Sequence, residues 1–360
     1  MDVVELPAAA GAGPVSVTSP VPRDVWWRAA RADGCALVTQ TPAWLDAICA
    51  TGPWTDAGRL YEFPDGACAV LPLVRRRGLP GPLTVEDSWP SGWGIGGPLL
   101  PDGDLLPAQA AAVLGDLVTR PALRVGVRFG PDEAPVWGQA LPAAFRAEAH
   151  YMQVVDLRGG FAAAWEHFRP RVKRDVHRAE RSPVEVVADR TGRLVPAFYA
   201  LWEKSVLRWA EQQHEPEALA RFRQGRAFPL RRLEAVAERL GEACTVYLAT
   251  CGGEPAAGAV VLRHGPHAKY WRGAMDRELA NPVRANHLLQ RLAIEDACAA
   301  GCRYYHMGDS RPGSSLAAFK ASFGARGRQS MRYTRERLPV SAADRALRGA
   351  AKRLLRFHDA

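Results

Sequence analysis

Apolar and polar positions in the first third of the chain alternate between helical stripes and short strand-like runs. Residues 41–50 have helical spacing and start at Thr41, whose hydroxyl suits a helix cap. Two apolar runs, 59–63 and 67–76, flank turn residues at 64–66 and predict a β-hairpin. A helix over 104–120 and a buried strand over 122–130 follow. This order predicts a unit that mixes helices with a sheet.

Three other segments of this part lack regular periodicity. Residues 1–22 are rich in alanine, glycine and proline, and we expect them to be flexible. Residues 88–100, SWPSGWGIGGPLL, crowd glycines around Trp89 and Trp93, which predicts a tight bend close to a binding surface. Residues 130–149 combine turn residues with mixed polarity and are the predicted linker.

The second half begins with a strand over 151–157 and a helix over 161–182. Apolar residues recur in that helix at spacings of three and four, so they form one stripe despite Pro170. Two more helices, 193–212 and 229–241, precede three strand candidates over 244–250, 256–264 and 268–274. A helix over 285–301, a strand over 303–308, a short helix and a last strand over 327–336 complete the order.

Length and composition favour two domains. The chain has 360 residues, of which 48% are hydrophobic and 24% are charged, enough for two ordinary cores. We expect a flexible N-terminus over 1–22, an N-terminal domain over 23–148, a C-terminal domain over 149–338 and a basic helix over 339–360. The fold class is α+β. In each domain, a mixed and mostly antiparallel sheet is expected to be flanked by helices.

Several functional classes are disfavoured by what the sequence contains. The seven cysteines include no C-x-x-C pair, and no H-E-x-x-H spacing occurs, so we expect reduced thiols and no metal. The N-terminus carries acids instead of a basic signal region, and no apolar run approaches the ~20 residues that span a bilayer. A soluble, cytoplasmic protein without stable membrane insertion is the expectation.

The formal net charge of +9 indicates an anionic partner. Residues 169–181 form a basic helix face that either tracks phosphates or is an ordinary solvated surface. Residues 341–360 form a basic amphipathic helix, which either contacts RNA or an anionic membrane or packs on the second domain through Leu347, Leu354 and Leu355. Charge by itself does not choose among these alternatives.

Lysine is rare in this chain, which makes Lys320 informative. Only five of the 47 basic residues are lysine, and Lys320 lies between Phe319 and Phe323 in an apolar helix. We expect Ser315 to cap that helix, Leu316, Phe319 and Phe323 to point inward, and Lys320 to lie at the rim of a cleft. The alternative is a snorkelling lysine whose stem covers Phe323.

Residues around the strand 268–274 and the helix after it are candidates for substrate binding. Tyr270 and Arg272 alternate with Trp271, which predicts that they share one face of the sheet. They would either orient substrate or pack across the strands. Arg284 precedes, and Asn286 lies in the first turn of, the helix whose N-terminal amides form a natural anion site.

The run from residue 269 to residue 324 carries a resemblance to a known family. The segments KYWRGAMDRE, ANHLLQRLAIEDACAAGCRYYHMGD and FKASFG resemble the Fem-type transferases of the GNAT superfamily, and residues 88–100 match in layout. The resemblance covers about residues 40–335 and implies two GNAT-like domains. It also implies transfer of an aminoacyl group from aminoacyl-tRNA, or of an acyl group from another donor, to an amine.

The family's F-K motif maps onto Phe319 and Lys320, which places Lys320 near the reacting carbonyl. GNAT acetyltransferases carry a glycine-rich pyrophosphate loop before the equivalent helix, whereas VRANHLL keeps Arg284 and has no glycine in that loop. This favours aminoacyl-tRNA over acyl-CoA as the donor, with no tightly bound cofactor. Amide formation also requires a proton acceptor, for which Asp309 and His306 are candidates.

The leading hypothesis is therefore an acyltransferase that forms an amide or ester bond, with aminoacyl-tRNA as donor and an amine of a small molecule or peptide as acceptor. One alternative is an acyl-CoA-dependent N-acyltransferase acting on a sugar or small amine. Another is a non-catalytic RNA-binding or scaffold protein on the same fold.

Overall fold

The chain is divided between two units, and three of its strands contribute residues to both. The computed structural model describes residues 2–6, 14–131 and 135–354. Unit 1 comprises residues up to 152 together with 309–311 and 327–338, and unit 2 comprises 153–308, 312–326 and residues from 339 onward. The predicted domain boundaries differ from this division at 309–311 and 327–338, which lie in unit 1. The amide of Ser310 bonds to the oxygen of Tyr151, and the last strand pairs with β8 (Arg124–Arg128).

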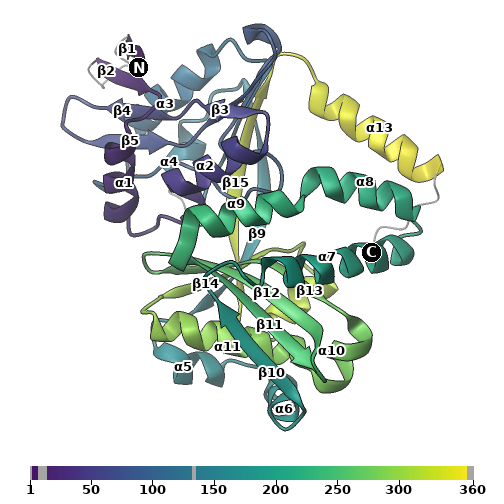
Figure 1. The fold of residues 1–360 in the computed structure, drawn as a ribbon. Coiled ribbons are helices and arrows are strands. Elements are labelled where there is room, and N and C mark those ends of the chain that lie inside the picture. The colour runs from purple at the N-terminus through teal and green to yellow at the C-terminus, as the bar shows by residue number, and fades with distance from the viewer. Residues whose placement is uncertain (1, 7–13, 132–134, 355–360) are drawn as a thin grey trace. The chain divides into compact units, whose positions relative to one another are not determined.

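Unit 1 contains two sheets and the helices that cover them (Figure 1). Its other elements are β1 (Asp2–Leu6), β2 (Val15–Ser19), α1 (Arg23–Ala32), the 3-10 helix η1 (Val38–Gln40), α2 (Pro42–Thr51), β3 (Trp54–Asp56), β4 (Arg59–Glu62), β5 (Cys68–Leu71), β6 (Val74–Arg76), η2 (Gly81–Leu83), β7 (Val85–Asp87), α3 (Pro107–Thr119), α4 (Val136–Gln139) and most of β9 (Phe145–Asp156) and β15 (Arg326–Glu336). One sheet has the order β1-β2-β4-β5, and the other includes β9-β15-β8-β7-β6-β3.

Local sequence signals are confirmed in much of unit 1. The Thr41 hydroxyl accepts a hydrogen bond from the amide of Trp44 at the start of α2, and β4 pairs with β5 as the predicted hairpin. The expectation of a flexible N-terminus is wrong for β2. Val15 and Val17 are buried there because alternate residues of this strand face the core of unit 1. The predicted linker instead contains α4 and the start of β9.

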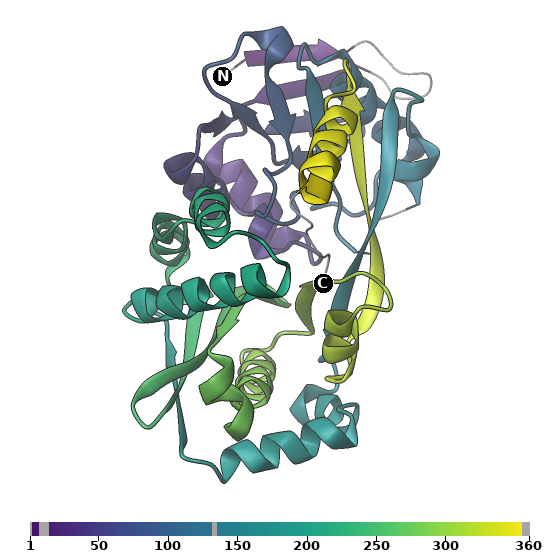
Figure 2. The same ribbon diagram turned by 90° about the vertical axis from the view of Figure 1, so that its right-hand side faces the viewer.

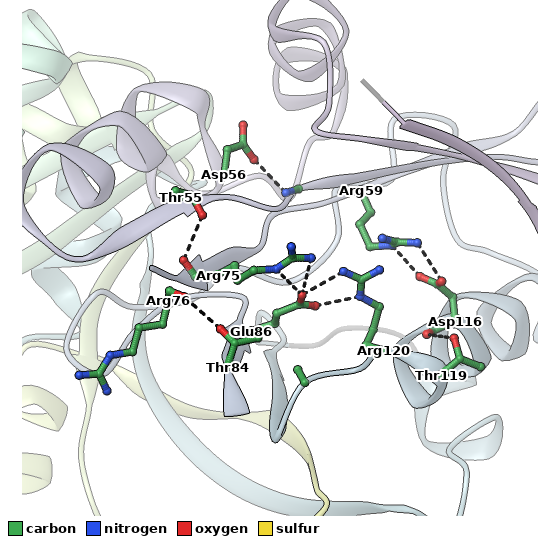
Figure 3. A network of polar contacts seen from close by, with 12 residues as sticks. Thr55, Asp56, Arg59, Arg75, Arg76, Thr84, Glu86, Asp116, Thr119 and Arg120 are labelled. Atoms are coloured by element: carbon green, nitrogen blue, oxygen red, sulfur yellow. Dashed lines mark hydrogen bonds and ion pairs between the residues drawn. The ribbon is translucent and has the colours of Figure 1, made fainter. Parts of the chain in front are cut away.

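A network of buried ion pairs lies beside this core (Figure 3). Glu86 accepts a bidentate pair of hydrogen bonds from Arg120, each 2.9 Å long, and a third from Arg75 at 2.8 Å. Arg59 donates to Asp116 over 2.8 Å. Because buried carboxylates are costly without partners, these arginines permit the acids to lie in the interior.

Unit 2 is built on the strand order β10-β11-β12-β13-β14, followed by the end of β9. Its elements are α5 (Gly160–Glu166), α6 (Pro170–Glu180), β10 (Val184–Asp189), α7 (Val195–Gln212), α8 (Glu217–Ala227), α9 (Leu230–Leu240), the 3-10 helix η3 (Gly241–Ala243), β11 (Cys244–Cys251), β12 (Glu254–His264), β13 (His267–Met275), α10 (Arg277–Val283), α11 (Ala285–Ala299), β14 (Tyr304–Asp309), α12 (Ser315–Ala321) and α13 (Val340–Leu354).

Helices cover both faces of this sheet (Figures 1 and 2). Helix α7 packs on β12 and β13 from one side, and α8 and α9 contact α7. Helices α5, α6 and α11 bury their apolar stripes against the opposite face. The pairs β10–β11, β11–β12 and β12–β13 are antiparallel and β13–β14 is parallel, which confirms the predicted mixed sheet flanked by helices.

Several predicted elements of unit 2 differ from the structure. The helix expected over 161–182 is two helices, because Pro170 cannot continue α5 and instead occupies the first position of α6. Helix α8 was not predicted, and α10 lies in a segment read as a loop. In α13, Leu347 is 71% exposed, so the predicted packing through this residue is wrong. The side chain of Leu354 and all of Leu355 lie outside the described residues.

Within the described residues, every helix is too short or too polar to cross a bilayer. The same part of the chain contains no group of three or more His, Cys, Asp or Glu side chains arranged to hold a metal ion.

Candidate active site

The parallel strands β13 and β14 are paired only over their first three positions. His267, Ala268 and Lys269 face Tyr304, Tyr305 and His306, and the ladder of this pair ends there. Both strands continue beyond this point, β13 to Met275 and β14 to Asp309. Beyond the ladder, the backbone amides and carbonyls on the facing edges of β13 and β14 are not used to pair these two strands. They can therefore form hydrogen bonds with another group, such as a ligand.

A β-bulge in β13 sets which side chains flank this opening. The register between β12 and β13 shifts so that Tyr270 lies opposite Val261 and Arg272 opposite Val260, with Trp271 as the extra residue. Tyr270 packs against the core beneath α6 and α11. Trp271 and Arg272 both contact Phe228, at the end of α8. The prediction that Tyr270 and Arg272 share one face is therefore wrong.

The Tyr270 side chain runs along its own strand toward Gly273. A Cβ atom at position 273 would lie 1.6 Å from the Tyr270 hydroxyl, so only glycine allows this orientation of the ring. Burial raises the pKa of Tyr270 to about 12, against a smaller opposing effect of Arg272. The hydroxyl is thus protonated at neutral pH and has a proton that it can donate in a hydrogen bond.

Helix α12 delivers Lys320 to the same region. Ser314, not the expected Ser315, caps this helix by accepting a hydrogen bond from the amide of Ala317. Leu316 is 51% exposed and does not point inward, because it lies in the first turn. Phe323 is fully buried against Phe168.

Lys320 is interior, with 4% of its surface exposed, although the sequence predicts a position at a rim. Its Nζ donates a hydrogen bond to the carbonyl oxygen of Gly308 over 3.0 Å. Gly308 has φ of +77°, and a Cβ there would lie 3.8 Å from that Nζ and 4.0 Å from the backbone oxygen of Tyr270. The ammonium group is therefore anchored to β14 beyond the end of the ladder that this strand shares with β13.

Phe319 links this lysine to the start of α11. Its ring lies 5.7 Å from the ring of His287 and 5.2 Å from that of Phe323. Asn286 is the second residue of α11 and is half-buried. Residues 319 and 320 thus lie on a helix that reaches the N-terminus of α11.

The N-terminus of α11 already has a carboxylate beside it. Asp175 of α6 lies 3.3 Å from Nε of Arg284 and 3.7 Å from Nε2 of His287. Burial lowers the pKa of His287; the charge of Asp175 opposes this effect, and the positive charges of Arg284 and Arg171 add to it. The helix end therefore carries a negative side chain where a ligand anion would otherwise be attracted.

His306 has a partner within the strand pair. Its Nε2 lies 2.9 Å from Nδ1 of His267, and it is buried. Its neighbours Tyr305 and Met307 belong to the core under α11, so His306 faces the opposite side of the sheet.

Asp309 ends β14 and lies one residue beyond Gly308. Its carboxylate accepts a hydrogen bond from Arg128 over 2.5 Å, and both residues belong to unit 1. Asp309 is exposed, as the sequence predicts for a residue at the start of a loop.

Arg272 lies among aromatic rings on the α7 side of the sheet. Its guanidinium carbon is 4.8 Å from the ring centre of Phe228 and 4.9 Å from that of Trp271. Burial lowers its pKa to about 10. Arg232 of α9, which the sequence analysis missed, also lies over Phe228, and burial together with the charge of Arg272 lowers its pKa to about 8.

Asp175, like Arg232, was not identified from the sequence. It is one of two acids in the basic stretch 169–181, and its importance depends on α11 packing against α6. An acid on the border of an otherwise basic helix face is the only sequence signal that marks it.

In unit 1, the loop after β7 occupies the space beyond the parallel pair of β7 and β8. Strands β7 and β8 pair in parallel over three positions, after which the amide of Ser88 bonds to Gly126 and the Ser88 hydroxyl accepts from the amide of Arg128. A Cβ at Gly96 would lie 2.2 Å from the backbone oxygen of Ser88, which confirms the predicted tight bend. Trp89 and Trp93 are buried, so they stabilise the loop.

Comparisons with known proteins agree with this architecture. Residues 166–320 match a family described as "Acetyltransferase (GNAT) domain". The crystal structure of FemX is similar, with a TM-score of 0.64 and 14% identity over 88% of this chain and 96% of that chain. A tandem GNAT protein from the clavulanic acid biosynthesis pathway gives a TM-score of 0.52 and 15% identity over 93% and 98% of the two chains.

A conserved protein of unknown function from Bacteroides thetaiotaomicron is also similar, with a TM-score of 0.54 and 13% identity over 88% of this chain and 96% of that one. No curated protein matches. Identities at this level establish the fold alone, and the domain match over 166–320 points to acyl transfer. The chain thus has the GNAT-type fold seen in FemX, and its unit 2 carries an acyltransferase domain.

Proposed function

We propose that unit 2 transfers an aminoacyl group from the 3′ end of a tRNA to an amine, forming an amide. In this reaction the amine attacks the ester carbonyl, negative charge develops on the carbonyl oxygen, and the ribose hydroxyl leaves. The acceptor is a small molecule or a peptide, and no tightly bound cofactor is required.

The burial of Lys320 beside Gly308 is the observation that carries this proposal. A positive group in a water-poor site stabilises a developing oxyanion more strongly than it would in water. An ammonium group has three N–H donors, so the bond to Gly308 does not by itself exhaust it. We assign to Lys320 the stabilisation of the tetrahedral oxyanion.

Neighbouring residues receive supporting roles in this proposal. The Tyr270 hydroxyl is a neutral donor, suited to orient the acyl group or the acceptor. Phe319 offers an aromatic surface next to Lys320, and Asn286 an amide at the start of α11. Arg284 acts indirectly, by holding Asp175 against α11, and Arg272 belongs to the Phe228 cluster.

The attacking amine must lose a proton. Of the two candidates, Asp309 is favoured, because His306 is hydrogen-bonded to His267 on the opposite face of the sheet from the core that contains Phe323. Asp309 follows Gly308 directly and retains exposed carboxylate surface despite its bond to Arg128. An aspartate can accept the proton directly or through a bound water.

The residues at the start of α11 bear on which donor the site accepts. A coenzyme A pyrophosphate would bring charge to a helix end that already has the Asp175 carboxylate within 4 Å of Arg284 and His287. An aminoacyl ester needs no pyrophosphate at that point. This arrangement supports aminoacyl-tRNA as donor.

A second candidate function is acyl-CoA-dependent N-acylation of a sugar or small amine. The match of residues 166–320 to a family described as an acetyltransferase domain favours it. In that case the opening between β13 and β14 would receive the acyl chain, and Lys320 would keep its role at the carbonyl. A non-catalytic RNA-binding or scaffold protein would show no turnover with either donor.

The test is to incubate the purified chain with charged tRNA or with acyl-CoA, together with a panel of amines, and to analyse the products by mass spectrometry. Amide formation from charged tRNA, lost in Lys320→Met, supports the proposal. Product from acyl-CoA alone replaces it with the second candidate. Absence of product from both donors rejects the two enzymatic functions for the acceptors used.

A further inference from the structure

Four arginines form a single row along the exposed face of α6. Arg171, Arg174, Arg178 and Arg181 follow one another at spacings of three, four and three, which places them on one side of the helix and its C-terminal cap. All four are exposed. Val172, Val176 and Ala179 on the other side are buried in the core of unit 2 and fix the helix in place.

The carboxylates near this α6 arginine row are engaged elsewhere. Glu166 pairs with Lys173 at 3.6 Å, Glu180 with His177 at 3.0 Å and Asp175 with Arg284 at 3.3 Å. In the part of the chain that the structure describes, none of the four arginines forms an ion pair. The row therefore presents uncompensated positive charge, which an extended anion would neutralise.

One end of the row is connected to the candidate active site. The amide of Arg169, just before α6, bonds to the carbonyl oxygen of Ser322 at the end of α12 over 2.9 Å. Arg171 lies near enough to His287 for its charge to lower the pKa of that residue. His287 contacts Phe319, the neighbour of Lys320. A ligand chain that leaves the site past Phe319 would meet Arg171 first.

We infer that the α6 arginine row binds successive backbone phosphates of one RNA strand, the strand that carries the acyl group to Lys320. This inference rests on the proposed function, since it names the surface that holds the donor. Arginines one helical turn apart are ~5 Å from each other along the axis, and their long side chains can each reach a phosphate.

An anionic membrane is a less suitable partner for this surface. Helices that bind a bilayer surface insert an exposed apolar face between the headgroups. The apolar face of α6 is buried inside unit 2, so only its polar side chains are presented. A line of charges without exposed apolar groups is suited to a linear polyanion.

The first experiment measures binding of uncharged tRNA by fluorescence anisotropy between 50 and 300 mM salt. The variant Arg174→Gln/Arg178→Gln is compared with Arg231→Gln/Arg239→Gln, which removes the same charge from exposed positions of α9. Loss of two phosphate contacts should reduce the slope of log K against log salt by about 1.4 to 1.8 and weaken binding roughly tenfold at low salt. The α9 variant should retain most of the slope.

Several outcomes would overturn the inference. These are no tRNA binding by the wild-type chain, an equal loss in the α6 and α9 variants, or binding to vesicles of phosphatidylglycerol in place of tRNA. Because all four arginines are exposed, the α6 variant should keep the thermal stability of the wild type. A variant with lysines at 174 and 178 should recover most of the binding, since phosphate contacts require charge.

A second experiment separates this inference from the proposed function. A minimal donor, an aminoacyl ester of adenosine, lacks the phosphates that the row would contact. The α6 variant should raise KM for charged tRNA about tenfold, leave kcat unchanged and leave turnover of the minimal donor unaffected, whereas Lys320→Met should lose both activities. Salt-dependent tRNA binding through the row without any turnover would sustain the inference while the proposed function fails.

Discussion

The Nζ atom of Lys320 donates a hydrogen bond to the backbone oxygen of Gly308 across 3.0 Å, so a buried ammonium is anchored to the end of β14. Residue 308 has a positive φ and no side chain, which leaves space for the lysine to approach the strand. This geometry distinguishes Lys320 from a snorkelling lysine, whose charged end would lie in water. It also places the charge where β13 and β14 no longer pair.

Replacing Lys320 by methionine should lower kcat/KM about a hundredfold, because methionine fills a similar volume but cannot donate to the oxyanion. Lys320→Arg should recover little, since a planar guanidinium does not reproduce the compact ammonium group. Initial rates with saturating amine, measured against donor concentration, give the comparison. Lys204→Met, which removes an exposed lysine paired with Asp276, serves as the control.

A purely structural role for Lys320 predicts a different pattern. The Gly308 oxygen left without its donor would reduce the free energy of unfolding by about 1 to 3 kcal/mol, but turnover of the folded fraction would be nearly normal. Rates corrected for the folded fraction at low temperature separate the two roles. A loss of less than threefold would assign Lys320 to packing.

The contact between Tyr270 and Gly273 should affect both the stability of the protein and its rate, and the two effects are tested separately. Gly273→Ala would put a methyl group 1.6 Å from the present position of the Tyr270 hydroxyl, so the ring must move. We expect a loss of about 1 to 3 kcal/mol in unfolding free energy, as in other overpacked sites. In the background of Tyr270→Ala the same glycine substitution should cost much less, and thermal melts of the four proteins complete the double-mutant cycle.

The rate effect is tested with Tyr270→Phe, which keeps the ring and removes the donor. A hydroxyl that orients a reacting group should be worth roughly tenfold in kcat/KM. Because the pKa of Tyr270 is about 12, the loss should be the same from pH 6 to pH 9. A pH-dependent loss in this range would mean that the hydroxyl ionises during turnover.

How far the sequence predicts this site depends on whether the signal is local. The hairpin over 59–76 and the Thr41 cap follow from neighbouring residues, and both are found in the structure. The relation of Tyr270 to Arg272 fails because the bulge at Trp271 changes the alternation, and nothing in the strand's own residues marks it. Arg232 and Asp175 were missed because only tertiary packing brings them to Arg272 and Arg284.

The residue type and the F-K motif identify Lys320 as a candidate, but they do not predict that it is buried. A helix of seven residues does not show from its sequence which side faces the core, so Leu316 was expected inside and Lys320 at an edge. The structure reverses both, because the carbonyl of Gly308 provides a partner for the amine in the interior.

Asp175→Asn should make the start of α11 more attractive to anions. Removing one negative charge next to a helix N-terminus is worth about 1 kcal/mol, so the affinity for coenzyme A or adenosine 3′,5′-bisphosphate should rise by roughly fivefold to tenfold. Isothermal titration calorimetry measures this change. Glu166→Gln, which removes a surface carboxylate paired with Lys173, should leave the affinity unchanged.

The same variant has a consequence for His287. Asp175 raises the pKa of His287 against the larger lowering effect of burial, so its removal should lower that pKa further below 6.5. A histidine whose folded pKa is depressed opposes folding once it must be protonated, so its stabilising contribution is present above pH 6.5 and is lost as the pH falls. The acid side of the stability curve should therefore be steeper in Asp175→Asn, which denaturant melts between pH 5 and pH 7 would test.

The Glu86 network of unit 1 should also lose stability as the pH falls, but at lower pH than His287 (Figure 3). Burial would raise the pKa of Glu86, but hydrogen bonds and charge from Arg120 and Arg75 outweigh it, and the pKa lies below its ordinary value of 4.5. Its contribution is thus complete above pH 4.5 and lost as the pH falls through the lower folded value. Glu86→Gln should reduce the unfolding free energy by about 3 to 5 kcal/mol at pH 7, because two arginines lose their buried partner.

The difference between wild type and Glu86→Gln should shrink below pH 4.5, since protonation neutralises the wild-type carboxyl as well. Urea melts at pH 7 and pH 4 measure both effects, with Asp24→Asn, which breaks an exposed pair with Arg28, expected to match the wild type at both. A difference in unfolding free energy that stays constant across this range would show that the variant acts through lost packing, because packing does not depend on pH. A loss below about 1 kcal/mol at pH 7 would mean that the arginines find other partners and that the carboxylate is not what holds β7 to the end of α3.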